Sequence, residues 1–369
     1  MPVPIDYAAL VRPQVAKLKP YTPGTTVSQA KAKYGLEHFV KLSSNENPLG
    51  TSPRALAALQ SLGELQIYVD DDHHELRERL AAPHGLQAAN VLVGHGSNDV
   101  VRTLFTALLV PGDEVVVADP TFSLFPKDAM LFDATAVKVP LRDGVHDLDA
   151  MLAAVTPKTK LVVVVDPNNP TATAVDRGAF ERFARALPER VVLMIDQAYR
   201  EYMPAGSVEG AAYAASRPAT IVLRTMSKIY GFASLRFGYA LGDAALLAYV
   251  ERVRVPFGVS RPAAVAALAA LDDDDFLRRS VANNEAGKAL LYPAFERLGL
   301  HAYTTAANFV ALEVRGTATE AYETLLARGI VTRSGDALGM PGRLRITIGT
   351  PEENALLLDA LRSLAPAAA

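Results

Sequence analysis

The sequence contains no cysteine in its 369 residues. Disulfides, zinc sites with thiolate ligands and cysteine nucleophiles are therefore excluded. Long hydrophobic runs are also missing: none approaches the roughly 18 residues that a membrane-spanning helix needs, and the first residues lack the apolar core of a signal peptide. There is no Lys/Arg-rich stretch, and the formal net charge is only −3, so nothing indicates a nucleic-acid partner. We expect a soluble cytoplasmic protein that binds neither membranes nor nucleic acids.

Strands and helices are expected to alternate over the middle of the chain. Apolar strands are expected at 91–97, 114–120, 134–141, 161–170, 191–199 and 220–228. Helices are expected at 53–62, 73–82, 98–109, 148–155 and 179–187. The strands are continuous apolar runs, as in a parallel sheet that is covered by helices on both faces. The pattern predicts an α/β fold with a large doubly wound, mostly parallel sheet.

The two ends of the chain have a different character. Residues 1–35 look like an arm with one short helix, because prolines and a glycine interrupt the segment. After about residue 262 a long helical tract is followed by two strands, at 308–314 and 343–349, and by further helices. This order predicts a smaller α+β domain. The four aspartates at 272–275 are expected to form a solvated loop or the start of a helix.

Small, polar or ionisable residues follow five consecutive expected strands. These stretches are GHGSND, DPTF, DPNNP, the segment with Asp196 and Tyr199, and TMSK. Each one alone is ordinary turn sequence. In open α/β sheets, however, ligands bind beyond the carboxyl ends of the strands. Five such stretches in a row therefore predict a binding site.

The GHGSND stretch is typical of an anion site. Its backbone N–H groups and the Ser97 hydroxyl would lie at the N-terminus of a helix, and Ser227 and Arg236 could bind the same phosphate. The stretch is not a dinucleotide-binding fingerprint, because Asp99 stands where the third glycine is required, and it is not a P-loop.

Asp196 and Lys228 each end an apolar strand. A bare carboxylate is costly there and is normally paired with a cation. Burial lowers the pKa of an amine and frees it to attack a carbonyl. Alone, Lys228 is better explained as a surface lysine after a strand. Together with a phosphate site, a carboxylate for a ring nitrogen, and a tyrosine and an asparagine for a phenolic oxygen, it indicates pyridoxal phosphate chemistry.

The chain resembles the fold-type I pyridoxal-phosphate aminotransferases, and among them the histidinol-phosphate aminotransferase family with its aromatic amino-acid aminotransferase relatives. The resemblance runs nearly from end to end. It rests on ten motifs in the family's order: YTPG, VKLSSNENPLG, GHGSNDV, DPTFSLFP, VPLRDGVHDLDAM, DPNNPT, IDQAYREY, LRTMSK…LRFGYALG, ANFV and LRITIGTPEEN.

The resemblance implies a role for each matching residue around the cofactor, pyridoxal 5′-phosphate. Lys228 is expected to bind the cofactor covalently and to move the proton between the substrate Cα and the cofactor C4′. Asp196 is expected to pair with the pyridinium nitrogen. Tyr199 and Asn169 are expected to hydrogen-bond the phenolic oxygen, and Phe122 to stack on the ring. The expected phosphate cradle consists of Ser97, Asn98, Thr225, Ser227 and Arg236.

The resemblance also implies how substrate and partner are bound. Tyr68 matches a tyrosine that reaches the cofactor phosphate of the neighbouring subunit, which implies a homodimer. Arg345 matches the clamp for the substrate carboxylate or an equivalent group, and Arg333 lies where a distal phosphate is bound. Asn45 and Glu46 belong to the segment that closes over the substrate.

The family's organisation implies three parts in this chain. Residues 1–35 are expected to form an arm that contributes to the small domain and to the dimer. Residues 36–262 are expected to form the large cofactor-binding domain, and residues 263–369 the small domain.

Four positions depart from the family pattern. Gln197 replaces a glutamate, Ala172 a glycine, Ser234 a glycine and Val69 a proline. None of these changes removes a catalytic group. They bear on the substrate and on catalytic efficiency more than on the reaction class.

The function expected first is a transaminase of histidine biosynthesis that acts on histidinol phosphate and 2-oxoglutarate. An aromatic amino-acid aminotransferase, acting on phenylalanine, is the alternative, because VRVPFGVS and NNPTAT also resemble the aromatic enzymes. A third possibility is a decarboxylase related to those that act on phosphothreonine, which would release carbon dioxide. A binding module without activity is disfavoured, since every cofactor-facing position is retained.

Overall fold

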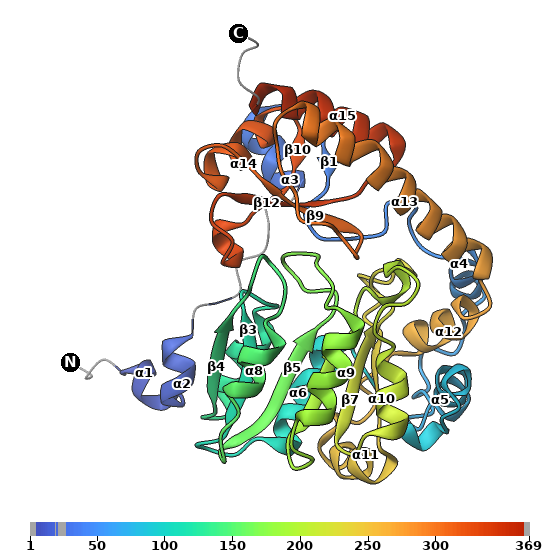
Figure 1. Cartoon of the computed structure of the whole chain (residues 1–369). Coiled ribbons are helices and arrows are strands. Elements are labelled where there is room, and N and C mark those ends of the chain that lie inside the picture. The colour runs from blue at the N-terminus through green and yellow to red at the C-terminus, as the bar shows by residue number, and fades with distance from the viewer. Residues whose placement is uncertain (1–4, 19, 21–26, 365–369) are drawn as a thin grey trace.

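The structure is a computed structural model that describes residues 5–18, 20 and 27–364. Its larger part is built on a seven-stranded sheet of order β2-β8-β7-β6-β5-β3-β4 (Figure 1). The strands are β2 (Val91–Gly94), β3 (Glu114–Asp119), β4 (Thr135–Pro140), β5 (Thr159–Val165), β6 (Val192–Asp196), β7 (Thr220–Thr225) and β8 (Gly238–Gly242). Only β8 runs against its two neighbours. The mostly parallel sheet expected from the apolar strands is confirmed.

Helices cover both faces of this sheet. On one face, Val162 and Val164 of β5 join a core that contains α8 (Leu148–Ala153), α9 (Arg177–Ala186) and α10 (Gly210–Ser216). On the other face, the alternate residues of β5 join a core that contains α6 (Ser97–Leu108), α7 (Leu124–Leu131) and α11 (Ala244–Val250). Burial on both sides explains why the strands read as continuous apolar runs. The doubly wound α/β fold is therefore confirmed.

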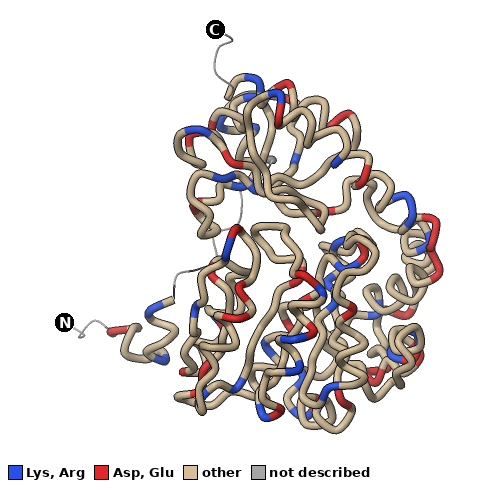
Figure 2. Tube along the Cα trace, in the orientation of Figure 1, with Lys and Arg blue, Asp and Glu red and all other residues tan. Residues whose placement is uncertain are grey.

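The C-terminal part contains a three-stranded antiparallel sheet of order β11-β12-β9. Its elements are β9 (Phe309–Glu313), β11 (Arg333–Ser334), β12 (Arg343–Thr347), α13 (Asp274–Arg297), α14 (Ala318–Ala327) and α15 (Pro351–Leu361). In Figure 1 this part lies over one end of the large sheet. Figure 2 shows acidic and basic residues interspersed along the whole trace, as the near-neutral charge suggests.

Two segments connect the two parts. β1 (Val40–Lys41) pairs in parallel with β10 (Ile330–Val331), so a segment far upstream of the large sheet packs with the C-terminal part. α12 (Arg261–Ala270) packs its buried alanines into the core of the large sheet and lies against α4 (Pro53–Gln60). The domain limits 1–35, 36–262 and 263–369 stay a prediction.

The arm was expected to contain one short helix, which is wrong. The described part of it contains α1 (Tyr7–Leu10), α2 (Pro13–Lys17) and α3 (Val27–Tyr34). The last of these is held by tertiary contacts, because Lys33 Nζ and Tyr34 Oη both bind the Glu323 carboxylate of α14, at 2.7 and 2.5 Å. The YTPG motif, at residues 21–24, lies outside the described residues.

Other local differences have simple causes. The expected helical tract after residue 262 is divided into α12 and α13, and Asp273 caps α13 by accepting from the Phe276 N–H. The aspartate run is thus a helix start. Strand β8 was not expected, since its sequence GYALG is rich in glycine. It forms because β2 and β7 supply hydrogen-bonding partners on both sides.

The helices of the described segments include none that is both long and apolar enough to cross a bilayer. The cytoplasmic location expected from the sequence stays a prediction. The remaining α-helix, α5 (His74–Ala81), packs its leucines against the edge of the large sheet near β2.

Candidate active site

A cavity lies at the carboxyl edge of the large sheet. The strands β2, β3, β5, β6 and β7 all run in one direction, so the polar stretches that follow them meet at this edge. The three-stranded sheet contributes Arg333 and Arg345 to the opposite wall. Thirteen of the fifteen predicted site residues line the cavity, and the two that do not are Tyr68 and Glu46.

Two glycines shape the expected phosphate cradle at the start of α6. Gly96 is the N-cap residue, with a φ of 79°, and a Cβ there would lie 2.4 Å from the Arg236 Nη2 atom. A Cβ on Gly238 would lie 2.2 Å from the backbone nitrogen of Ser97. Only glycine at these positions lets the guanidinium and β8 approach the helix N-terminus. The result is a cationic group beside the N–H groups of a helix start, which is an anion site.

The hydroxyls of Thr225 and Ser227 lie in the same wall and are already ordered. The Thr225 Oγ1 atom accepts from the Ser227 N–H at 3.1 Å and donates to the Ser227 Oγ at 3.0 Å. Arg236 adopts a left-handed conformation with a φ of 61°, and its Nη1 donates to the Ala233 carbonyl at 2.9 Å. These contacts orient the hydroxyls and the Arg236 guanidinium within the cavity.

Lys228 follows β7 and points into the cavity. Its Nζ donates to the Ser44 carbonyl at 3.1 Å and lies 5.6 Å from the centroid of the Tyr199 ring. Burial and, to a smaller extent, the nearby Arg345 guanidinium lower the pKa of Lys228 to about 8. The amine is therefore partly unprotonated near neutral pH, as a nucleophile must be.

Asp196 ends β6 on the cavity wall and is buried. Its Oδ1 accepts from the Ala198 N–H at 3.0 Å. Burial raises the pKa of Asp196 to about 6. The Ala198 N–H and the Lys228 ammonium lower this pKa, but by less than burial raises it. A cationic group placed against this carboxylate would keep it ionised.

Tyr199 and Asn169 present hydrogen-bond donors to the cavity. The Tyr199 hydroxyl accepts from the Asn45 Nδ2 at 2.9 Å, so its own proton is free to point elsewhere. The Asn169 Oδ1 accepts from Arg345 Nη1 at 2.9 Å, which directs the Asn169 amide nitrogen away from that guanidinium. Phe122, also in the wall, offers an aromatic face for a planar ring.

Arg333 and Arg345 face each other across neighbouring strands. They are register partners in the β11–β12 pair, and both line the cavity. Like charges directly opposite each other on a sheet are destabilising, so this pair favours an anion between or beside the two groups. Arg345 Nη2 also donates to the Ser43 carbonyl at 2.7 Å.

Two predicted residues lie elsewhere. Glu46 is ion-paired with Lys41 at 2.7 Å, outside the cavity wall. Tyr68 is 77% exposed, on the surface of this chain. The roles assigned to both stay predictions.

Several contributors to the site were missed from the sequence. The backbone carbonyls of Ser43 and Ser44 hold Arg345 and Lys228, and the Phe309 ring packs 5.1 Å from the Tyr199 ring. The only available signal was their position in the SSNENP and ANFV motifs, because a carbonyl contact depends on the path of the backbone and leaves no trace in residue type.

Two departures from the family pattern are accommodated locally. The Gln197 amide donates to the Val208 carbonyl at 2.9 Å and accepts from the Gly210 N–H at 3.1 Å. An amide can do both, whereas a carboxylate could not donate to the carbonyl. Ala172 keeps the left-handed conformation that the family's glycine suits, with a φ of 65°.

The residues present fit pyridoxal phosphate. The glycine-shaped cradle suits its phosphate, the buried Asp196 carboxylate its ring nitrogen, and the Tyr199 and Asn169 donors its phenolic oxygen. Lys228 supplies the amine. Among the described residues there is no group of three acidic, histidine or cysteine side chains that could hold a metal ion.

Fold and site together define a pyridoxal-phosphate-dependent aminotransferase. A family model described as "Aminotransferase class I and II" matches residues 37–361. The chain belongs to the histidinol-phosphate aminotransferase family within that class.

The individual similarities are extensive. The chain is 40% identical to the histidinol-phosphate aminotransferase of Moorella thermoacetica over 364 residues, which cover 98% of this chain and 94% of that protein. It is 42% identical to histidinol-phosphate aminotransferase 2 of Pseudomonas aeruginosa over 360 residues, which cover 96% and 98%. The crystal structure of histidinol-phosphate aminotransferase from Sinorhizobium meliloti in complex with pyridoxal-5′-phosphate matches with a TM-score of 0.87 and 28% identity, covering 96% of this chain and 97% of that one.

Proposed function

We propose that this enzyme transfers the amino group of histidinol phosphate to 2-oxoglutarate. The observation that carries the proposal is the cross-strand pair of Arg333 and Arg345 on the cavity wall. Two adjacent guanidinium groups suit a phosphate on one substrate and the carboxylates of the other. The names of the curated relatives, at about 40% identity over nearly the whole chain, support the same substrate.

The bound cofactor supplies an aldehyde that condenses with amines and a ring that accepts the electrons left when a Cα–H bond breaks. We infer that the Lys228 Nζ, which is partly unprotonated near neutral pH at a pKa of about 8, is the base that takes and returns the proton. Asp196 would keep a proton on the ring nitrogen through its negative charge. Tyr199 and Asn169 would orient the ring through its phenolic oxygen, and Arg345 would hold the substrate anion.

The reaction can be tested with purified, cofactor-loaded enzyme and 2-oxoglutarate. We expect kcat/KM to be higher for histidinol phosphate than for phenylalanine. In the half-reaction with the amino donor alone, the Arg333→Ala variant should lose activity mainly toward histidinol phosphate, since phenylalanine has no distal phosphate. Absence of turnover with histidinol phosphate would overturn the proposal. Turnover of phenylalanine in its place would indicate the aromatic enzyme, and release of carbon dioxide would indicate a decarboxylase.

We also propose that the chain works as a homodimer, with Tyr68 reaching the neighbouring site. Tyr68 belongs to a group of exposed apolar side chains on two adjacent segments: Leu65, Ile67, Tyr68, Val255 and Phe257. The rings of Tyr68 and Phe257 are 4.5 Å apart, which joins the segments into one patch. Exposed apolar patches mark interaction sites. Light scattering should give twice the chain mass of 39.4 kDa, and a monomer would contradict the proposal.

A further inference from the structure

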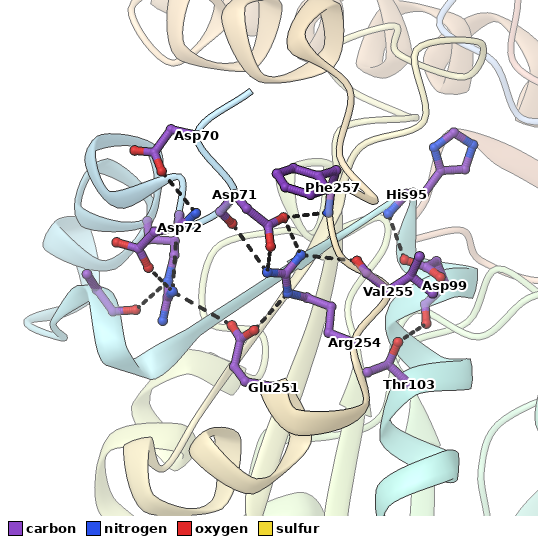
Figure 3. A network of polar contacts seen from close by, with 12 residues as sticks. Asp70, Asp71, Asp72, His95, Asp99, Thr103, Glu251, Arg254, Val255 and Phe257 are labelled. Carbon is purple, nitrogen blue, oxygen red and sulfur yellow. Dashed lines mark hydrogen bonds and ion pairs between the residues drawn. The ribbon is translucent and has the colours of Figure 1, made fainter. Parts of the chain in front are cut away.

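Arg254 forms ion pairs with Asp71, three residues after Tyr68 in the chain, and with Glu251 (Figure 3). Arg254 binds both carboxylate oxygens of Asp71, with its Nη1 and Nη2 atoms at 2.9 and 2.8 Å. Its Nε donates to the Glu251 carboxylate at 2.7 Å. This two-pronged geometry is the strongest form of a carboxylate–guanidinium contact.

The pair is partly shielded from solvent. The side chain of Arg254 is 12% exposed and that of Asp71 is 28% exposed. The hydrogen bond from Arg254 holds the pKa of Asp71 below its usual range, so the carboxylate stays charged at neutral pH. Fully exposed ion pairs contribute little to a defined geometry. This pair is therefore a better anchor than the surface pairs of the chain.

The same carboxylate also binds the backbone of Phe257. The Asp71 Oδ1 accepts from the Phe257 N–H at 2.7 Å. Phe257 has a φ of 55°, a left-handed conformation that a bulky residue keeps only where its surroundings impose it. In this position its ring packs on the Tyr68 ring, with 4.5 Å between centroids. The Tyr68 carbonyl also accepts from the Arg261 Nη2 at 3.4 Å.

These contacts form a chain of positions from Arg254 to Tyr68. Arg254 fixes Asp71, Asp71 fixes the backbone of Phe257, and the Phe257 ring supports Tyr68. Tyr68 has no place in the cavity of its own subunit, since it is exposed on the surface. The network thus supports, through the Phe257 ring, an exposed tyrosine that does not reach the cavity of its own subunit.

We propose that Asp71 and Arg254 are positioning residues that hold Tyr68 ready to bind the cofactor phosphate of the partner subunit. The inference rests on the proposed homodimer. It adds that the cofactor affinity of each site depends on an ion pair in the other subunit.

The first experiment measures the affinity of apo-dimer for pyridoxal phosphate by equilibrium dialysis. Tyr68→Phe, Asp71→Asn and Arg254→Ala should each weaken binding, by about tenfold for the loss of one hydrogen bond to a charged group. The double variant Tyr68→Phe/Arg254→Ala should be no worse than either single variant, because both remove the same contact. Arg254→Lys should recover part of the affinity.

A matched control is the exposed i,i+4 ion pair of α9, Arg177–Glu181, at 2.8 Å. The Arg177→Ala variant should bind the cofactor as the unmodified chain does. Additive losses in the double variant would overturn the proposal, since Arg254 would then act independently of Tyr68. If Arg254→Ala fails to fold, the affinities of the Asp71→Asn and Arg254→Lys variants test the same proposal.

The second experiment uses mixed dimers of one Arg254→Ala chain and one Lys228→Ala chain. The two chains carry different tags, so that the mixed dimer can be purified from both homodimers. In such a dimer the intact Lys228 belongs to the Arg254→Ala chain, while Tyr68 reaches it from a chain with an intact network. We expect that site to bind and, after borohydride, to retain the cofactor with the affinity of the unmodified dimer. An affinity as weak as in the Arg254→Ala homodimer would show that Arg254 acts within its own subunit and would overturn the inference. A monomer by light scattering would instead refute the proposed dimer.

Discussion

At the scale of single residues, the site depends on two ionisable groups that burial holds away from their ordinary pKa values. Lys228 is made less basic and Asp196 more basic. Both shifts are unfavourable for the empty protein and useful in the proposed reaction, where the Lys228 amine attacks a carbonyl and the Asp196 carboxylate faces a cation.

Replacing Lys228 tests the first of these groups. The Lys228→Ala enzyme should lose transamination by more than about a thousandfold, since both covalent binding and proton transfer depend on the same Nζ atom. Absorbance spectra after borohydride treatment and gel filtration should show cofactor retained by the unmodified chain but not by the variant. Covalently retained cofactor in the variant would contradict the assignment of the lysine.

The pH dependence of cofactor capture follows from the same pKa. Capture by the apo-enzyme should accelerate as the pH rises through about 8, because the fraction of neutral Lys228 amine increases there. Stopped-flow absorbance between pH 6 and 9.5 gives the profile. A rate that falls over this range would contradict the prediction.

Replacing Asp196 should raise the stability of the apo-protein and lower its activity. Its folded-state pKa of about 6 lies above the ordinary 3.8, so its contribution to stability is present below pH 3.8 and is lost as the pH rises through 6. At pH 7 the Asp196→Asn apo-protein should therefore be more stable, by about 1–3 kcal/mol, yet bind the cofactor weakly and turn over slowly. Urea unfolding checks this, with the exposed Asp149→Asn as control. A less stable Asp196→Asn variant would contradict it.

At the scale of elements, the junction of β8 and α6 is set by steric contact. β8 lies between β2 and β7 and runs against both, which brings Gly238 against Ser97 at the start of α6. The Arg236 guanidinium rests on Gly96 at the same junction. The proposed phosphate cradle therefore depends on a reversed strand, a helix start and two residues without a Cβ at one place.

Gly96→Ala should weaken cofactor binding by about tenfold or more, because the new Cβ would displace the Arg236 guanidinium. Gly112 is a matched control: its φ of 91° also lies where alanine is strained, but nothing lies within 4 Å of the added Cβ. Gly112→Ala should lower the melting temperature and leave the cofactor affinity unchanged. Equal affinity losses in both variants would assign the effect to backbone strain alone.

At the scale of the whole molecule, the cavity joins the two sheets. Lys228 and Arg345 come from different sheets, and both are tied to the backbone of the segment at 43–45. That segment follows β1, which pairs with β10 of the C-terminal part. A ligand that binds both walls should therefore restrain this segment and the small sheet together.

Hydrogen exchange can test this coupling. Adding 2-oxoglutarate to the cofactor-loaded enzyme should slow exchange in residues 40–47 and 330–345, because the ligand anion links the arginines to the large sheet. Strand β5, buried in the sheet centre, should show no change and serves as the internal control. Unchanged exchange at 40–47 would contradict the coupling.

The sequence determined the layered fold and the reaction class. Continuous apolar strands predicted burial on both faces, and the polar residues after each strand predicted the edge where the cavity lies, because periodicity and strand ends are local properties. The tertiary structure decided what depends on contacts between distant segments. It formed β8 from a glycine-rich stretch, brought Arg333 opposite Arg345, used the Ser43 and Ser44 carbonyls as acceptors, and left Tyr68 outside its own cavity. None of these is encoded in residue type alone, since register, backbone path and exposure arise only when the whole chain packs.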